Sequence, residues 1–209
     1  MNIKKIYGVL FLAFILWGIV FAIKPFNFWV SMSLAVLILI FIVLLFDKTV
    51  FFKIKISYKN ILYSSLSSLF LYFIFFIGNK VLILINSKFE ILNNRLMFLN
   101  NIYANKTGLS PFVISVLIVF PIAFGEEIFW RGFIQNNLED HMNKVFAFLF
   151  TALLYTAVHI ISFNPILIIA ALTCGLFWGF IYMKTKNLTL VLFSHIFWDI
   201  MIFILFPVK

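Results

Sequence analysis

The sequence has few charged residues, few glycines and prolines, and a single cysteine. Only 11% of its 209 residues are charged, against about a quarter in a typical soluble domain, which excludes a soluble monomer. Eight glycines and five prolines exclude collagen-like chains and Pro/Gly-rich disordered chains. The one cysteine, Cys174, cannot form an internal disulfide, and its apolar surroundings favour a packing residue over a reactive thiol.

Long apolar runs dominate what is present. Hydrophobic residues make up 65% of the chain and the mean hydropathy is +1.15, and a membrane-spanning helix needs about 20 mainly apolar residues. Seven runs qualify: Ile6–Ile23, Phe26–Phe46, Ile61–Ile77, Pro111–Phe133, Val145–Ile161, Pro165–Met183 and Leu188–Phe206. We therefore predict an all-α, polytopic integral membrane helical bundle of about seven transmembrane helices. The number of transmembrane helices can range from six to eight, because the segment Val81–Ser110 is ambiguous. It could extend the third span or add another span, but we expect it to form an interfacial helix plus loop.

The organisation predicted is one membrane domain over residues 1–209. No internal repeat and no Pro/Gly/Ser-rich linker divides the chain. We expect residues 1–110 to supply scaffold helices and the interfacial loop, because the first three predicted spans contain no acidic, basic or histidine side chain. The catalytic helices are then expected within residues 111–206.

The formal charge of +9 comes from 16 basic and 7 acidic residues. Most basic residues lie between apolar runs rather than in one patch, which indicates contact with lipid headgroups and favours no nucleic-acid partner. With the N-terminus in the cytoplasm, ten of them fall on that side and six on the other, as the positive-inside rule favours. Lys-, Phe- and Asn-rich short loops indicate the cell membrane of a prokaryote.

Ionisable residues inside predicted spans are the most informative feature. Glu126, Glu127, His159, His195 and Asp199 all lie in apolar runs of the second half. A charge at the centre of a bilayer costs at least ~2.5–3.5 kcal/mol, so such residues need partners or water and are functional candidates.

The first cluster is Glu126-Glu127-Ile128-Phe129-Trp130-Arg131, on a helix expected to run through Pro121. Glu127 and Arg131 stand four residues apart with the acid first, the favourable order for an intrahelical ion pair. We assign this pair a structural role. Glu126 points about 100° away and lacks that local partner, which makes it the better chemical candidate.

Two further clusters follow on later helices. Tyr155-x-x-x-His159 ends the next span; Glu126 and His159 lie at similar sequence distances from the intervening polar turn, so an antiparallel hairpin brings them to one depth. His195-x-x-x-Asp199 lies on one face of the last span. Taken singly, a histidine or a His–carboxylate pair is often a packing feature. Together, the three clusters favour a site.

These motifs resemble those of the CAAX prenyl protease and bacteriocin-processing family, also called the Abi or type II CAAX endopeptidase family. Glu126-Glu127-x-x-x-Arg131 is similar to its EExxxR motif, Tyr155-x-x-x-His159 to FxxxH, and His195-x-x-x-Asp199 to HxxxN or HxxxD. The resemblance covers roughly Pro111 to Phe206. Tyr155 replaces a phenylalanine, and Asp199 stands where asparagine is commoner.

The resemblance implies an intramembrane endopeptidase with a cavity open to the cytosol and a glutamate-activated water, without an obligatory metal. Glu126 would be the base, and His159 would orient the water or share its proton. His195 would bind the oxyanion, with Asp199 fixing its tautomer or donating beside it. The implied partner is a peptide or protein substrate, either free or anchored in the bilayer.

Three alternatives stay open. Two histidines and a carboxylate also describe a zinc site, with Glu126, His159 and His195 as ligands, although the HExxH pattern of zinc-protease helices is absent. A proton-coupled transporter could use the same groups as a relay, but repeated halves are not evident. A catalytically inactive scaffold or self-immunity protein is the third. The sequence identifies neither the substrate, prenylated or not, nor the oligomeric state.

Overall fold

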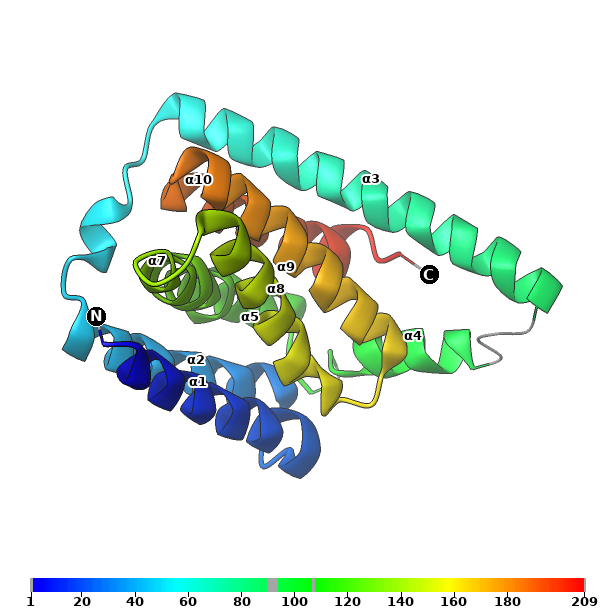
Figure 1. Ribbon diagram of the computed structural model, residues 1–209. Helices are drawn as coiled ribbons and strands as arrows, with labels where there is room; N and C mark the ends of the chain where they lie inside the picture. The colour runs from blue at the N-terminus through cyan, green and yellow to red at the C-terminus, as the bar shows by residue number, and fades with distance from the viewer. Residues whose placement is uncertain (1, 90–93, 107, 209) are drawn as a thin grey trace.

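The computed structural model describes residues 2–89, 94–106 and 108–208, and within them the regular structure is entirely helical (Figure 1). The α-helices are α1 (Ile3–Gly18), α2 (Phe28–Phe46), α3 (Tyr58–Phe89), α4 (Arg95–Ala104), α5 (Pro111–Leu117), α6 (Phe124–Glu127), α7 (Asn136–Leu138), α8 (Lys144–Ile160), α9 (Pro165–Thr185) and α10 (Leu188–Asp199). Wider helical turns extend α1 to Ile23 and α10 to Leu205, and they join α5, α6 and α7 through Ile118–Ala123 and Ile128–Gln135.

The prediction of a polytopic helical membrane bundle is confirmed. Within the described residues, six helical segments are long and apolar enough to cross a membrane: Ile3–Ile23, Phe28–Phe46, Tyr58–Ile85, Pro111–Leu138, Pro165–Thr185 and Leu188–Leu205. The seventh predicted span is α8, which has 17 residues and is shorter than the others.

The third predicted span is longer than expected. The polar residues Asn79 and Lys80 do not break a helix, and α3 continues through them to Phe89. The interfacial helix expected after it corresponds to α4, whereas Glu90 lies outside the described residues.

Asparagine side chains explain where many helices begin. At the first turn of a helix the backbone N–H groups lack intrahelical partners, and short polar side chains accept hydrogen bonds from them. Capping side chains of this kind are Asn2, Asn27, Ser110, Asn143, Asn164 and Asn187. The Asn-rich loops of the sequence therefore serve the helices that they precede.

We expected the helix carrying the first motif to run unbroken through Pro121, and this expectation is wrong. Phe120 has extended backbone angles (φ −148°, ψ 123°), and α6 begins three residues after the proline. A proline inside a helix removes one backbone donor and clashes with the preceding turn, so an interruption here has a direct cause. Glu126 and Glu127 consequently lie in the short helix that follows the break.

Gly125 fixes the position of that short helix. A β-carbon added at Gly125 would lie 2.3 Å from Cγ1 of Val36 and 2.6 Å from Cδ1 of Ile40, both on α2. The backbone of α6 therefore packs directly against side chains of α2, at the residue preceding Glu126.

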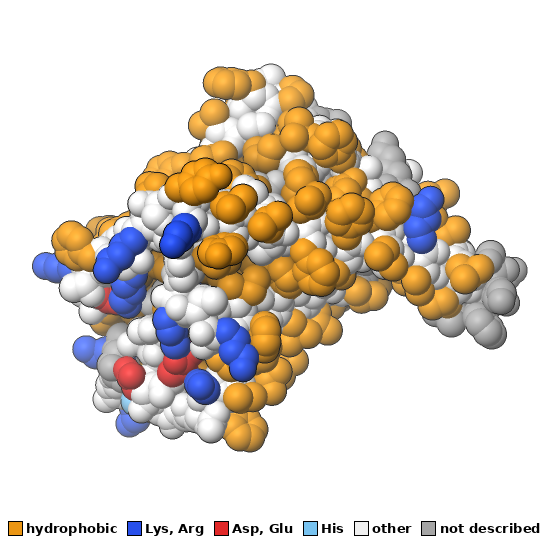
Figure 2. All heavy atoms as spheres, turned by 90° about the horizontal axis from the view of Figure 1, so that it is seen from above, with side chains coloured by type: hydrophobic (Ala, Val, Ile, Leu, Met, Phe, Trp, Pro, Cys, Tyr) orange, Lys and Arg blue, Asp and Glu red, His pale blue; other side chains and the backbone are white. Residues whose placement is uncertain are grey.

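The two ends of the bundle differ. In Figure 1, α3 and α10 lie along one side and α1 and α2 along the opposite side, with α8 and α9 between them. The N-terminus, α7 and the α2–α3 connection are at one end; α4 and the C-terminal segment are at the other. Most lysine and arginine side chains visible in Figure 2 gather at the N-terminal end, and hydrophobic side chains cover the flank.

Candidate active site

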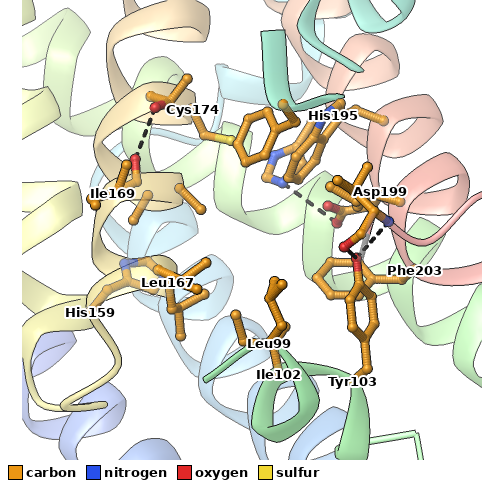
Figure 3. A pocket seen from close by; sticks show the side chains of 18 of the residues that line it. Leu99, Ile102, Tyr103, His159, Leu167, Ile169, Cys174, His195, Asp199 and Phe203 are labelled. Atoms are coloured by element: carbon orange, nitrogen blue, oxygen red, sulfur yellow. Dashed lines mark hydrogen bonds and ion pairs between the residues drawn. The ribbon is translucent and has the colours of Figure 1, made fainter. Parts of the chain in front are cut away.

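Four of the predicted site residues line one cavity. Glu126 from α6, His159 from α8, and His195 and Asp199 from α10 are all buried and border a space of about 260 Å³. In Figure 3, His159 lies on one side of the cavity and His195 and Asp199 lie together on the other. The side chains that the sequence spreads over 74 positions are therefore gathered by three helices.

Glu126 has a partner that the sequence analysis did not find. Its Oε2 accepts a hydrogen bond of 3.0 Å from the hydroxyl of Tyr155 on α8. Tyr155 is the first residue of the second motif, where the resembling family has phenylalanine. The signal was available, because the hydroxyl of a tyrosine in an apolar span needs a polar partner.

Glu127 and Arg131 form the predicted ion pair, with Nη1 of Arg131 2.8 Å from Oε1 of Glu127 and both side chains almost fully buried. Nη2 of Arg131 also lies 3.4 Å from the backbone oxygens of Cys174 and Gly175 on α9. The pair thus connects α6 to α9 as well as joining two turns of its own helix.

The same oxygen of Glu127 lies 2.9 Å from Nδ1 of His195. A carboxylate beside an arginine only accepts hydrogen bonds, so Nδ1 of His195 carries a proton. This corrects our expectation that Asp199 fixes the tautomer: Glu127 holds Nδ1, and Asp199 faces the other ring nitrogen, with Oδ2 3.5 Å from Nε2.

His159 is oriented by its own helix. Its Nδ1 lies 2.7 Å from the backbone oxygen of Tyr155, one turn earlier. A carbonyl oxygen accepts only, so Nδ1 carries the proton and Nε2 of the neutral ring is an acceptor. The rings of Phe21 and Trp17 pack beside the imidazole, with centroids 5.6 and 6.3 Å away.

Trp178 is a second residue that the sequence analysis missed. Its ring stacks on His195 with centroids 3.9 Å apart and planes 25° apart. Nε1 of Trp178 donates to Oγ of Ser194 at 3.1 Å, and Oγ of Ser67 lies 2.9 Å from the same oxygen. Nothing in a tryptophan within an apolar run distinguishes this contact from ordinary packing, so no signal in the sequence could have found it.

The N-terminal half of the chain contributes to the cavity wall. Phe21, in the wide turn that follows α1, and residues of α2, α3 and α4 line the space together with the motif-bearing helices. From α4, Leu99, Ile102 and Tyr103 close one side, as Figure 3 shows. The Tyr103 hydroxyl donates to the backbone oxygen of Val208 and accepts from its N–H, at 3.2 and 3.1 Å. Burial raises the pKa of Tyr103 to about 12, so this hydroxyl stays neutral.

The three residues of the zinc alternative line the same cavity but are not grouped as metal ligands within the described part of the chain. Among residues 2–89, 94–106 and 108–208, no group of three His, Cys, Asp or Glu side chains is arranged to hold a metal ion. His159 and His195 each use Nδ1 in a contact with the protein, and their other nitrogens lie on opposite sides of the cavity (Figure 3).

Comparison with protein families supports the resemblance. Residues 108–201 match the model of a family described as type II CAAX prenyl endopeptidase Rce1-like, and this segment contains all three motifs. This matched segment, which covers less than half of the chain, is similar to that family. The similarity indicates a protease of the CAAX type at family level, and the six apolar helices found among the described residues support an integral multi-pass membrane protein. No curated protein and no solved structure matches the chain.

Proposed function

We propose that this Rce1-like protein hydrolyses peptide bonds within the membrane by means of a water molecule that Glu126 activates. The observation that carries the proposal is the cavity itself: a carboxylate, two imidazoles and a second carboxylate from three helices border one buried space. Hydrolysis of an amide needs a base for the water and hydrogen-bond donors for the oxyanion, and these groups supply both.

In the first step, Glu126 accepts a proton from water while the water oxygen attacks the carbonyl carbon of the scissile bond. Nε2 of His159 accepts the second hydrogen of the water and orients it. Nε2 of His195, when protonated, donates to the oxyanion that forms. The tetrahedral intermediate then collapses, the C–N bond breaks, and Glu126 returns its proton to the leaving amine.

Asp199 completes the arrangement in one of two ways. Ionised, it favours a proton on Nε2 of His195, which lies 3.5 Å away; protonated, it donates a hydrogen bond as asparagine does. Because Glu127 already fixes Nδ1, Asp199 is left to act on Nε2 or on the substrate.

The chemistry proposed for these residues needs no metal ion. The water is activated by a carboxylate and the oxyanion is stabilised by hydrogen bonds, so we propose a metal-independent hydrolysis.

The substrate proposed is a peptide or protein with an apolar segment next to the scissile bond. Most of the cavity wall is aromatic or aliphatic, including Phe28 and Trp29 from α2 and Phe75 from α3. An apolar segment of the substrate would bury its surface against this wall and leave the polar groups for the peptide bond.

For the location we propose the cell membrane of a prokaryote. The family resemblance and the positive-inside rule then predict that the cavity opens on opposite sides of the membrane. The resemblance implies an opening to the cytosol, but the cavity occupies the half of the bundle near Phe28 and Val208, away from the N-terminal end. Arg131 is buried within the bundle, which leaves nine basic residues at the N-terminal end. Fewer of the described basic side chains, among them Lys24, Lys80 and Lys106, lie at the other end. The positive-inside rule therefore orients the cavity away from the cytoplasm.

Replacement of Glu126 tests the function. Glu126→Gln keeps the size of the side chain but removes the proton acceptor, so cleavage of a peptide library by the purified protein in detergent should fall at least ~100-fold. Glu139→Gln is the matched control, because Glu139 pairs with Lys186 at the opposite end of the bundle. Normal cleavage by folded Glu126→Gln would refute the mechanism, and no cleavage by the wild type would favour the inactive scaffold.

A further inference from the structure

Of the two defining residues of the second motif, Tyr155 has a hydroxyl that the proposed mechanism has not used. Tyr155 is 5% exposed, and its hydroxyl is 3.0 Å from Oε2 of Glu126. A phenylalanine would fill the same space with the same ring contacts. Packing therefore accounts for the ring of Tyr155 but not for its hydroxyl.

The ring is held tightly enough to aim this hydroxyl. Trp130 meets it edge-on, with centroids 5.4 Å apart and planes at 90°. The guanidinium carbon of Arg131 lies 5.1 Å from the ring centroid, a cation–π contact on the face. The imidazole of His159, one turn later, lies 4.9 Å away.

Gly175 of α9 makes room for this arrangement. A β-carbon at Gly175 would lie 3.3 Å from Cδ1 of Tyr155 and 3.2 Å from the backbone oxygen of Ala152. The close approach of α9 to α8 thus limits the positions that the tyrosine ring can take.

We propose that Tyr155 is a positioning residue for the glutamate-activated water, holding Oε2 of Glu126 so that Oε1 is left to take the proton. This inference rests on the proposed function. A carboxylate attached through a flexible side chain can rotate, and one fixed oxygen defines where the other points. Tyr155 also accepts the Nδ1 hydrogen bond of His159 through its backbone oxygen. One residue therefore orients both groups that act on the water.

The hydrogen bond also affects when Glu126 can act as a base. A donor to a carboxylate favours the ionised form, so removing the donor moves the protonation midpoint to higher pH. The other titratable or charged side chains in this region are Glu127, Arg131, His159, Cys174, His195 and Asp199. Tyr155→Phe leaves all of them in place, so a shift in this variant reports on the hydroxyl alone.

Tyr155→Phe is the test, and Tyr182→Phe is the matched control. Tyr182 is also a buried tyrosine, but its hydroxyl donates to Asn136, at 3.3 Å, and it does not line the cavity. In Tyr155→Phe, the acidic limb of the pH dependence of kcat/KM should move up by about one pH unit, equivalent to about 1.4 kcal/mol. Activity on that limb then falls about tenfold, with a smaller loss at the plateau. Tyr182→Phe should match the wild type.

A second measurement needs no activity. Infrared difference spectra follow the protonation of Glu126 through the carboxylic-acid band that is missing from Glu126→Gln. The midpoint of this band should move to higher pH in Tyr155→Phe and stay in place in Tyr182→Phe. An unchanged midpoint, or a loss of activity that is uniform across pH, would overturn the positioning role. Activity in Glu126→Gln would instead overturn the proposed function, so the two failures are distinguishable.

Discussion

Replacing Arg131 by alanine should destabilise the protein strongly, because it leaves a buried carboxylate without its cation. The side chains of Arg131 and Glu127 are 1% and 0% exposed, and Nη1 and Oε1 are 2.8 Å apart. Removal of one partner of a buried ion pair costs about 3–5 kcal/mol of unfolding free energy. The substitution also removes the contacts of the guanidinium with the α9 carbonyls and with the rings of Tyr155 and Trp178.

The assay is unfolding in mixed micelles with increasing denaturing detergent, followed by far-ultraviolet circular dichroism. Arg131→Lys should fall between wild type and Arg131→Ala, because an ammonium keeps the charge but not the planar fork that reaches both Glu127 and α9. The double variant Glu127→Gln/Arg131→Ala should lose less stability than the two single variants added together. The coupling expected for residues in direct contact is about 0.5–3 kcal/mol.

Two results would refute this reasoning. Wild-type stability together with full activity in Arg131→Ala would mean that the ion pair contributes nothing to the fold. Wild-type stability with lost activity would instead place Arg131 among the groups that act on the substrate or on Glu126.

Three further predictions follow from the site and its surroundings. Dialysis against a strong chelator should leave peptide cleavage intact, and elemental analysis should find well below one zinc per chain. If the activity were lost and then restored by zinc, Glu126, His159 and His195 would be zinc ligands. Asp199→Asn should retain substantial activity and Asp199→Leu should not, since only asparagine keeps a hydrogen bond toward Nε2 of His195; full activity of folded Asp199→Leu would remove the residue from the site. Because Cys174 is buried, single cysteines can report the orientation: an impermeant maleimide added to intact cells should label Lys24→Cys at the cavity end and not Lys144→Cys at the other. The reverse pattern would give the cytosolic opening that the resemblance implies.

The sequence was sufficient for the class of fold and for the motif residues, for a physical reason. Ionisable side chains in apolar runs are costly, so Glu126, His159 and Asp199 stand out wherever they occur. Similar sequence distances from the polar turn at residues 140–143 also predicted that Glu126 and His159 share a depth, and both line the cavity.

The side-chain contacts that the sequence did not predict depend on how each helix is rotated and how closely it packs against its neighbours. The hydrogen bond from Tyr155 to Glu126 requires a particular rotation of α8, which is limited by its contact with Gly175. The stacking of Trp178 on His195 and the role of Glu127 on Nδ1 depend in the same way on how α9 and α6 meet α10. The spacing of apolar and polar residues along one helix does not determine how that helix is rotated and packed against its neighbours.

The contact of Gly125 with α2 has a consequence for how this protein can be divided in the laboratory. Residues 108–201 carry every motif, which invites their transplantation into another membrane scaffold. Yet the backbone beside Glu126 is shaped to Val36 and Ile40, which lie far outside that segment. A chimera should therefore exchange α2 together with the motif-bearing helices, because a foreign helix with bulkier side chains at this level would displace the glutamate while leaving all three motifs intact.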